Sequence, residues 1–107
     1  MESRLIYESN KTFTNKVDWN RKKGSETEWI YFELTQINTH EDIIRECFDR
    51  DVLHVSLGRH NSFTENKNGM FDKIKALLGV ASFKIWDEAF TKTIEVSNIG
   101  VYRIGVA

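Results

Sequence analysis

Several features that would mark a specialised class of protein are missing from this sequence. The chain of 107 residues has one cysteine, Cys47, and no proline. A single cysteine excludes an internal disulfide and a multi-cysteine metal site, and it fits a reducing compartment. No apolar run approaches the roughly 18 residues that span a bilayer, and residues 1–4 lack the basic start and apolar segment of a signal peptide. We therefore expect a cytoplasmic protein.

Motifs for phosphates and metals are missing as well. The six glycines form neither of the glycine-rich patterns, GxxxxGK and GxGxxG, that cradle nucleotide phosphates. The three histidines, His40, His54 and His60, show no HxxxH spacing. The lone Cys47 falls on the apolar side of a predicted helix. We therefore expect no metal and no cofactor.

The net charge is only −1, but the charges are unevenly distributed. Residues 10–25 contain five basic residues and one acidic residue, whereas residues 26–51 contain eight acidic residues and two basic ones. The overall balance argues against a general nucleic-acid-binding protein, which usually carries a basic surplus. The acidic segment favours a basic partner instead.

What the sequence does have is a regular alternation of hydrophobic patterns. Period-two patterns predict strands at residues 4–9, 28–37, 52–57, 80–86, 92–97 and 100–106. Amphipathic patterns predict helices at 38–49 and 69–79, the second closed by Gly79 in a left-handed conformation. The sequence thus predicts one domain over residues 1–107, with residues 10–27 as a long loop or mobile arm. The predicted fold is α+β: a mixed or antiparallel sheet of about five to six strands, two helices on one face, and a C-terminal β-hairpin.

The predicted faces of these elements divide core from surface. In the strand at 52–57, we expect Leu53, Val55 and Leu57 to face the core, with His54 and Ser56 on the opposite face. In the helix at 38–49, the apolar stripe is Ile43, Ile44, Cys47 and Phe48. In the strand at 28–37, Ile30, Phe32 and Leu34 would face the core, and Trp29, Tyr31 and Glu33 would share the other face.

Two groups of residues are candidates for binding a protein. Trp29, Tyr31 and Glu33 would place large amphipathic rings beside a carboxylate, which is typical of a binding hot spot if no helix covers that face and of a core if one does. The carboxylates at Glu41, Asp42, Glu46 and Asp49 occupy the polar side of the predicted helix, where a solvated face explains them better than a cation site. Together they predict a non-enzymatic domain of the immunity-protein or antitoxin class, which neutralises a basic toxin or nuclease.

An enzymatic alternative rests on the end of the strand at 52–57. His54, Arg59 and His60 could form a metal-independent ribonuclease site, in which two imidazoles transfer protons and the guanidinium holds the phosphate. The run Arg21-Lys22-Lys23 could then contact phosphates, and Trp19 could stack on a base. In the other interpretation, His54 is a half-buried strand residue, and Arg59 and His60 belong to an ordinary solvated loop.

Overall fold

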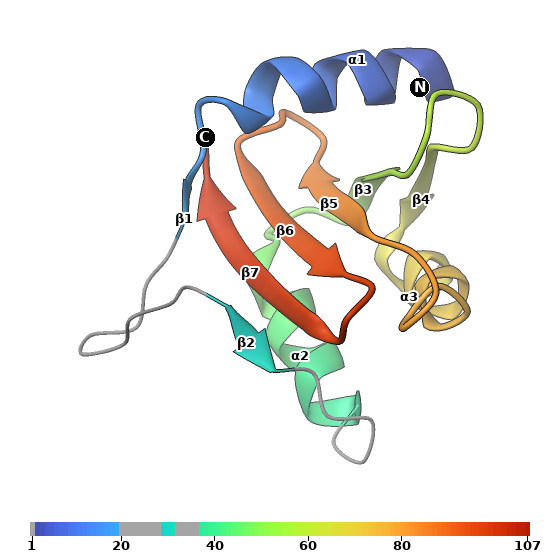
Figure 1. Ribbon diagram of the computed structural model, residues 1–107, viewed down its shortest axis with the longest axis vertical. Helices are drawn as coiled ribbons and strands as arrows, with labels where there is room; N and C mark the ends of the chain where they lie inside the picture. Colours follow the sequence, from blue (N-terminus) through green and yellow to red (C-terminus); the bar gives the residue numbers. More distant parts are fainter. Residues whose placement is uncertain (1, 20–28, 32–36) are drawn as a thin grey trace.

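One antiparallel sheet with helices on both faces forms the framework of the molecule (Figure 1). The computed structural model describes residues 2–19, 29–31 and 37–107. Three helices lie within these residues: α1 (Ser3–Thr14), α2 (Ile37–Cys47) and α3 (Lys67–Lys75). The strands are β1 (Asp18–Trp19), β2 (Ile30–Tyr31), β3 (Val52–Ser56), β4 (Phe63–Asn66), β5 (Phe83–Asp87), β6 (Lys92–Ser97) and β7 (Val101–Val106). The predicted α+β class and the C-terminal hairpin, β6–β7, are confirmed.

The strands follow the order β1-β7-β6-β5-β3-β4, and β2 also pairs with β7. Every pairing is antiparallel. In the hairpin, Ser97 pairs with Val101 and Glu95 with Arg103. Gly100 has φ +91°, a left-handed conformation that glycine adopts without steric cost and that lets the chain reverse within this tight turn.

The face of the sheet under α2 and α3 carries the apolar core. Leu53, Val55, Ile85 and Ile94 are each 0% exposed on this face. The helices contribute a second set of buried residues to the same cluster: Ile44, Phe48, Met70, Phe71 and Ile74. This arrangement confirms the predicted inward direction of Leu53 and Val55. It also confirms the two helices expected from residues 38–49 and 69–79, although both end earlier in the chain than predicted.

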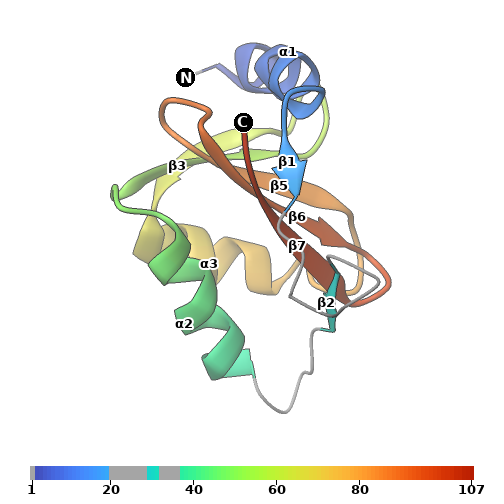
Figure 2. The same cartoon turned by 90° about the vertical axis from the view of Figure 1, so that its left-hand side faces the viewer.

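The opposite face is covered in part by α1 (Figure 2). The sequence predicts a strand for residues 4–9, which belong to this helix. Leu5, Ile6 and Tyr7 resemble a short β-prone run, but Leu5 is exposed and Ile6 is buried, and the partly buried residues further along the segment include Asn10 and Phe13. Ile6, Asn10 and Phe13 are spaced by four and three residues, which is the period of a helix. The prediction of a strand at 4–9 and a loop from residue 10 was therefore wrong, because it divided one amphipathic helix between two elements.

Two further predicted segments differ from the structure. In the segment predicted as a strand at 28–37, only Ile30 and Tyr31 form strand, residues 32–36 lie outside the described residues, and α2 begins at Ile37. Ile30 was predicted to face the core, but it is 38% exposed and lies outside it. The polar loop predicted at 59–68 contains β4, whose residues pair with β3. Of the helices in the described part of the chain, none has the length and apolar character needed to cross a bilayer.

Candidate functional site

Three carboxylates form an acidic face on and just after α2. Asp42, Glu46 and Asp49 are all exposed. Asp42 and Glu46 lie one turn apart on α2, and Asp49, after the helix end, pairs with Lys92, which lines the same groove as Glu46. The Asp49 side chain is 84% exposed and accepts a hydrogen bond from Lys92 Nζ at 3.2 Å. An ion pair this exposed contributes little to stability, so Asp49 is available to a partner. We call Asp42, Glu46 and Asp49 the acidic face.

Glu41, predicted to belong to the same surface, has a different environment. Its side chain is 16% exposed and forms ion pairs with Arg45 at 3.1 Å and Lys75 at 3.7 Å. Arg45 also donates a hydrogen bond to Asn68 Oδ1 at 2.8 Å. Glu41 therefore links α2 to α3 and is not part of the acidic face.

An apolar groove of about 240 Å³ lies beside the acidic face. Its walls come from the end of α2 and from β6 and β7, and Glu46 and Lys92 also line it. The apolar part of the lining is Cys47, Phe48, Ile104 and Val106. Burial raises the pKa of the Cys47 thiol, so the neutral thiol is favoured there. Ile43, predicted as core, is 36% exposed on α2. Exposed apolar area and carboxylates therefore occur together on this side of the molecule.

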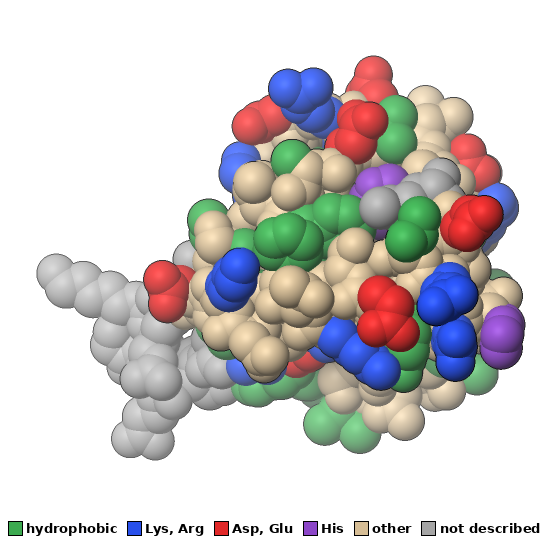
Figure 3. All heavy atoms as spheres, turned by 90° about the horizontal axis from the view of Figure 1, so that it is seen from above, with side chains coloured by type: hydrophobic (Ala, Val, Ile, Leu, Met, Phe, Trp, Pro, Cys, Tyr) green, Lys and Arg blue, Asp and Glu red, His purple; other side chains and the backbone are tan. Residues whose placement is uncertain are grey.

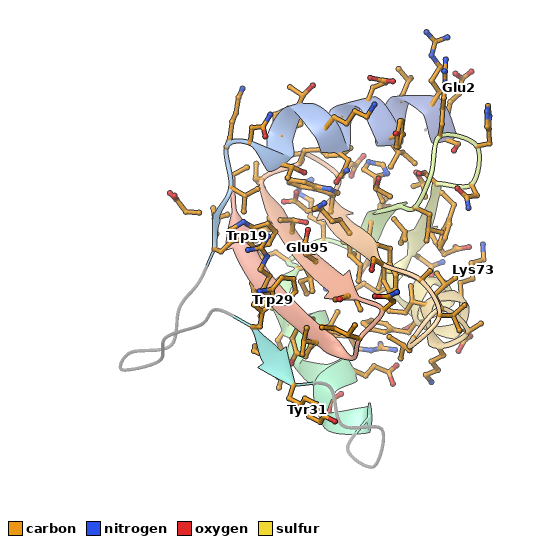
Figure 4. The ribbon with its side chains drawn as sticks, in the orientation of Figure 1. Glu2, Trp19, Trp29, Tyr31, Lys73 and Glu95 are labelled. Carbon is orange, nitrogen blue, oxygen red and sulfur yellow. The ribbon has the colours of Figure 1, made fainter. Side chains whose placement is uncertain are left out.

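The two predicted aromatic residues lie in different environments. Tyr31 is 68% exposed on β2. Trp29, just before β2, is partly buried, and the guanidinium carbon of Arg103 lies 4.6 Å from its ring centroid. Figure 4 shows Trp29 close to Trp19 and Glu95 over β6 and β7, whereas Tyr31 points away from them. Glu33, the third member of the predicted group, lies outside the described residues.

His54, the centre of the alternative ribonuclease site, is 4% exposed. Its ring stacks on Phe90 with 5.1 Å between the centroids, and Nδ1 lies 2.7 Å from Thr64 Oγ1. Burial lowers the pKa of His54, although the nearby carboxylates of Glu88 and Asp87 oppose this effect. The neutral imidazole is thus favoured. His54 lies on the face opposite the Leu53 core, as predicted, but it is buried there because α1 packs against β3.

Arg59 and His60 are exposed on the loop between β3 and β4. Ser3 Oγ donates a hydrogen bond to the Arg59 carbonyl oxygen at 2.8 Å and accepts one from Ser62 N–H at 2.9 Å, which ties this loop to the start of α1. Ser56, the other polar residue of this strand end, is also buried. The structure therefore exposes Arg59 and His60 but not His54, and it presents no common surface of the three side chains.

The residues predicted to contact nucleic acid in the ribonuclease alternative are only partly described. Arg21, Lys22 and Lys23 lie outside the described residues. Among the residues described, no group of three or more His, Cys, Asp or Glu side chains is placed to hold a metal ion. Trp19 contacts Arg103, whose guanidinium carbon lies 3.8 Å from its ring centroid. Arg103 is thus held between Trp19 and Trp29.

A second pocket, of about 280 Å³, lies on the sheet face that α1 only partly covers. Lys84 pairs with Glu95 across β5 and β6, and Glu95 pairs with Arg103 across β6 and β7. Their charges alternate, and each side chain is close to 20% exposed. Sequence reasoning missed this row. A signal existed, because the predicted hairpin places Glu95 opposite Arg103.

Comparison with known proteins found no match: no family model, no curated protein and no solved structure resembles this chain. The function must therefore be argued from the residues themselves.

Proposed function

We propose that this chain is a non-enzymatic binding domain that neutralises a basic protein, in the manner of an immunity protein or antitoxin, with a nuclease toxin as the expected type of partner. One observation carries the proposal: the exposed carboxylates of the acidic face lie beside an apolar groove. Carboxylates raise the association rate of a basic partner and select against acidic ones. The groove offers a place for an apolar anchor residue, which usually supplies most of the binding energy.

The distribution of charge supports this choice of surface. The exposed residues on and next to α1 mix both signs: Arg4, Glu8 and Lys11 lie on the helix, Glu2 precedes it and Lys16 follows it. Figure 3, seen from above over α1, shows acidic and basic side chains interspersed on that side. The acidic face has three carboxylates, with Lys92 as the ion-pair partner of Asp49. A basic partner is therefore attracted to the side of α2 more strongly than to the side of α1.

The ribonuclease alternative receives no support from the described geometry. A general base must reach its substrate within hydrogen-bond distance. His54 is buried beneath α1, stacked on Phe90 and engaged by Thr64. Substrate could meet this imidazole only if α1 left the sheet. We therefore retain the binding role.

The test uses a charge reversal with a matched control. The tagged protein is used to isolate a partner from its native host at low salt, and the purified partner is then titrated calorimetrically. Glu46→Lys with Asp49→Lys should weaken binding by more than about tenfold at low ionic strength, and less at high salt because screening removes the attraction.

The control is Glu8→Lys with Asp72→Lys, which changes the net charge equally at two exposed sites on α1 and α3. It should leave affinity within about twofold, because these charges lie outside the proposed interface. Unchanged affinity in the Glu46/Asp49 variant would contradict the proposal. An equal loss in both variants would also contradict it, since the effect would then come from net charge alone.

A further inference from the structure

The pocket on the α1 side of the sheet contains a buried hydroxyl without a protein partner. Ser56 is 3% exposed and lines the pocket of about 280 Å³. The Ser56 side chain makes no hydrogen bond to the residues that the structure describes. Every fully enclosed side-chain nitrogen or oxygen of the described residues has a partner, so the Ser56 oxygen is not fully enclosed. The Ser56 hydroxyl must therefore open into the pocket. A hydroxyl that opens into a pocket and has no partner among the described residues can hydrogen-bond a ligand there.

Asn10 brings a second free donor to the same pocket. Its Oδ1 accepts a hydrogen bond from Trp86 Nε1–H at 2.8 Å. Because an indole nitrogen only donates, this bond fixes which end of the amide is oxygen. The amide nitrogen donates no hydrogen bond to any residue that the structure describes, and Asn10 lines the pocket.

The acceptors around the pocket are largely engaged already. Glu95 Oε1 accepts from Arg103 Nε at 2.9 Å and lies 2.8 Å from Arg103 Nη2. Its Oε2 lies 3.0 Å from Lys84 Nζ. A lysine ammonium has three hydrogens, so this ion pair leaves Lys84 able to donate further. The pocket therefore has spare donors on Asn10, Ser56 and Lys84, and Glu95, the one carboxylate among its described lining residues, already faces two basic side chains.

We propose that this pocket binds the carboxylate of a small organic acid. Hydrogen bonds to an ionised acceptor are shorter and stronger than neutral ones, so spare donors that include an ammonium favour a carboxylate over a carbonyl. The volume lies near the lower end of the roughly 300–1,000 Å³ typical of ligand pockets, which limits the ligand to a small molecule or a chain end. Trp29 lines the pocket and provides an apolar surface for the body of the acid.

Benzoate and benzamide form a matched pair of probes, because they share a ring and differ in the charge of the polar group. In two-dimensional NMR at constant ionic strength, benzoate should give saturable shifts at the Ser56 and Lys84 backbone amides and at the Asn10 side-chain amide. Benzamide should bind at least about tenfold more weakly. Absence of saturation with benzoate, or equal binding of benzamide, would overturn the proposal.

Variants test the named donors one at a time. Asn10→Asp keeps the oxygen that accepts from Trp86 but replaces the donor with a carboxylate, so benzoate binding should fall more than about tenfold. Asn61→Asp, at an exposed position, makes the same charge change and should leave binding unaltered. Ser56→Ala should weaken binding about ten- to a hundredfold, since it removes one hydrogen bond to a charged group, and it provides a readout even if Asn10→Asp does not fold. Full binding in Ser56→Ala or in a folded Asn10→Asp would refute the assignment.

The carboxylate could belong to a free acid or to the C-terminus of a peptide. Acetyl-Gly-Phe with a free C-terminus distinguishes these sources when compared with its C-terminal amide and with benzoate. Tighter binding of the free-acid peptide than of benzoate assigns the site to a chain end, and the reverse order assigns it to a small acid. Neither order depends on the acidic face, so this result is independent of the partner proposed above.

Discussion

The two faces of the sheet solve the problem of burial in different ways. On the α2 and α3 side, the strand residues are aliphatic or aromatic and pack against apolar helix residues. On the α1 side, the buried row contains His54, Trp86 and Thr93, which use hydrogen bonds as well as packing. Beyond α1, the same face continues into the row of Lys84, Glu95 and Arg103. One face therefore stabilises the fold, and the other combines stability with chemical groups that can recognise a ligand.

This difference follows from how many helices lie against each face. Among the described helices, α2 and α3 lie against the apolar face and α1 against the other (Figure 2). On the α1 side, Lys84, Glu95 and Arg103 each keep about a fifth of the side chain exposed. A charged residue is tolerated on this part of the sheet when an opposite charge pairs with it, and Glu95 pairs with Lys84 and Arg103. The polar pocket forms at the boundary between the covered and uncovered parts.

The largest expected loss of stability comes from a substitution in the apolar face. Ile85→Ala removes a side chain that is 0% exposed. The lost burial and the resulting cavity should lower the free energy of unfolding by about 2–5 kcal/mol, measured by urea denaturation. Ile99→Ala removes the same atoms from a residue that is 78% exposed and should change it little. Equal losses in the two variants would show that the α2 and α3 face is not the main core.

A smaller loss of stability is expected on the other face, where β1 packs closely against Gly105 of β7. A Cβ at Gly105 would clash with Val17 Cγ1 and lie 2.8 Å from Trp19 Cε3. Gly105→Ala should therefore displace β1, move Trp19 away from Arg103 and cost about 1–3 kcal/mol. Urea denaturation followed by tryptophan fluorescence measures both effects. In the control Gly58→Ala, the added Cβ meets the movable side chain of Asn61, so the loss should be smaller. If Gly58→Ala lowers the free energy of unfolding as much as Gly105→Ala does, the close approach of β1 to Gly105 is not the cause of the loss.

The smallest expected effect is a pH dependence of stability that comes from His54 on the α1 side of the sheet. The pKa of His54 is lowered in the folded protein by burial, so the unfolded state binds more protons as the pH falls below the ordinary histidine value of about 6.5. Stability from this residue is complete above that pH. It decreases as the pH falls towards the folded-state pKa, by about 1.4 kcal/mol per pKa unit of difference.

The measurement is the free energy of unfolding at several pH values between about 5 and 8. His54→Gln should remove part of the loss that wild type shows on acidification, whereas His60→Gln, at an exposed position, should retain it. If the three proteins show the same pH dependence, His54 is not buried as described.

Much of the sheet could be predicted because its longer strands carry a regular period. β6 has the predicted bounds, and β7 begins one residue later than predicted. β1 and β2 have only two residues each, too few to show any period. α1 was missed because Asn10, a polar residue, occupies a half-buried helical position, and its role depends on Trp86 far along the chain. No local pattern reveals such a long-range hydrogen bond.

The candidate sites divide in the same way. Helical spacing made Asp42 and Glu46 predictable neighbours, whereas Asp49 lies beyond the end of α2 at Cys47. The donors of the polar pocket come from α1, β3 and β5, and only the packing of α1 on the sheet brings Asn10 near Ser56 and Lys84. Glu95 and Arg103 lie between these cases, because the hairpin register follows from the turn.

The short strands at one side of the sheet restrict how other chains can attach. β2 pairs with Val101 and Tyr102 at the start of β7, and β1 pairs with Gly105 and Val106 at its end. At the other side, β4 has four residues and runs directly into α3. Among the described strands, those at either side of the sheet thus offer an incoming strand short backbone segments to extend, which disfavours edge-to-edge pairing. The partner proposed above is then expected to recognise side chains, which can change in evolution without altering the sheet.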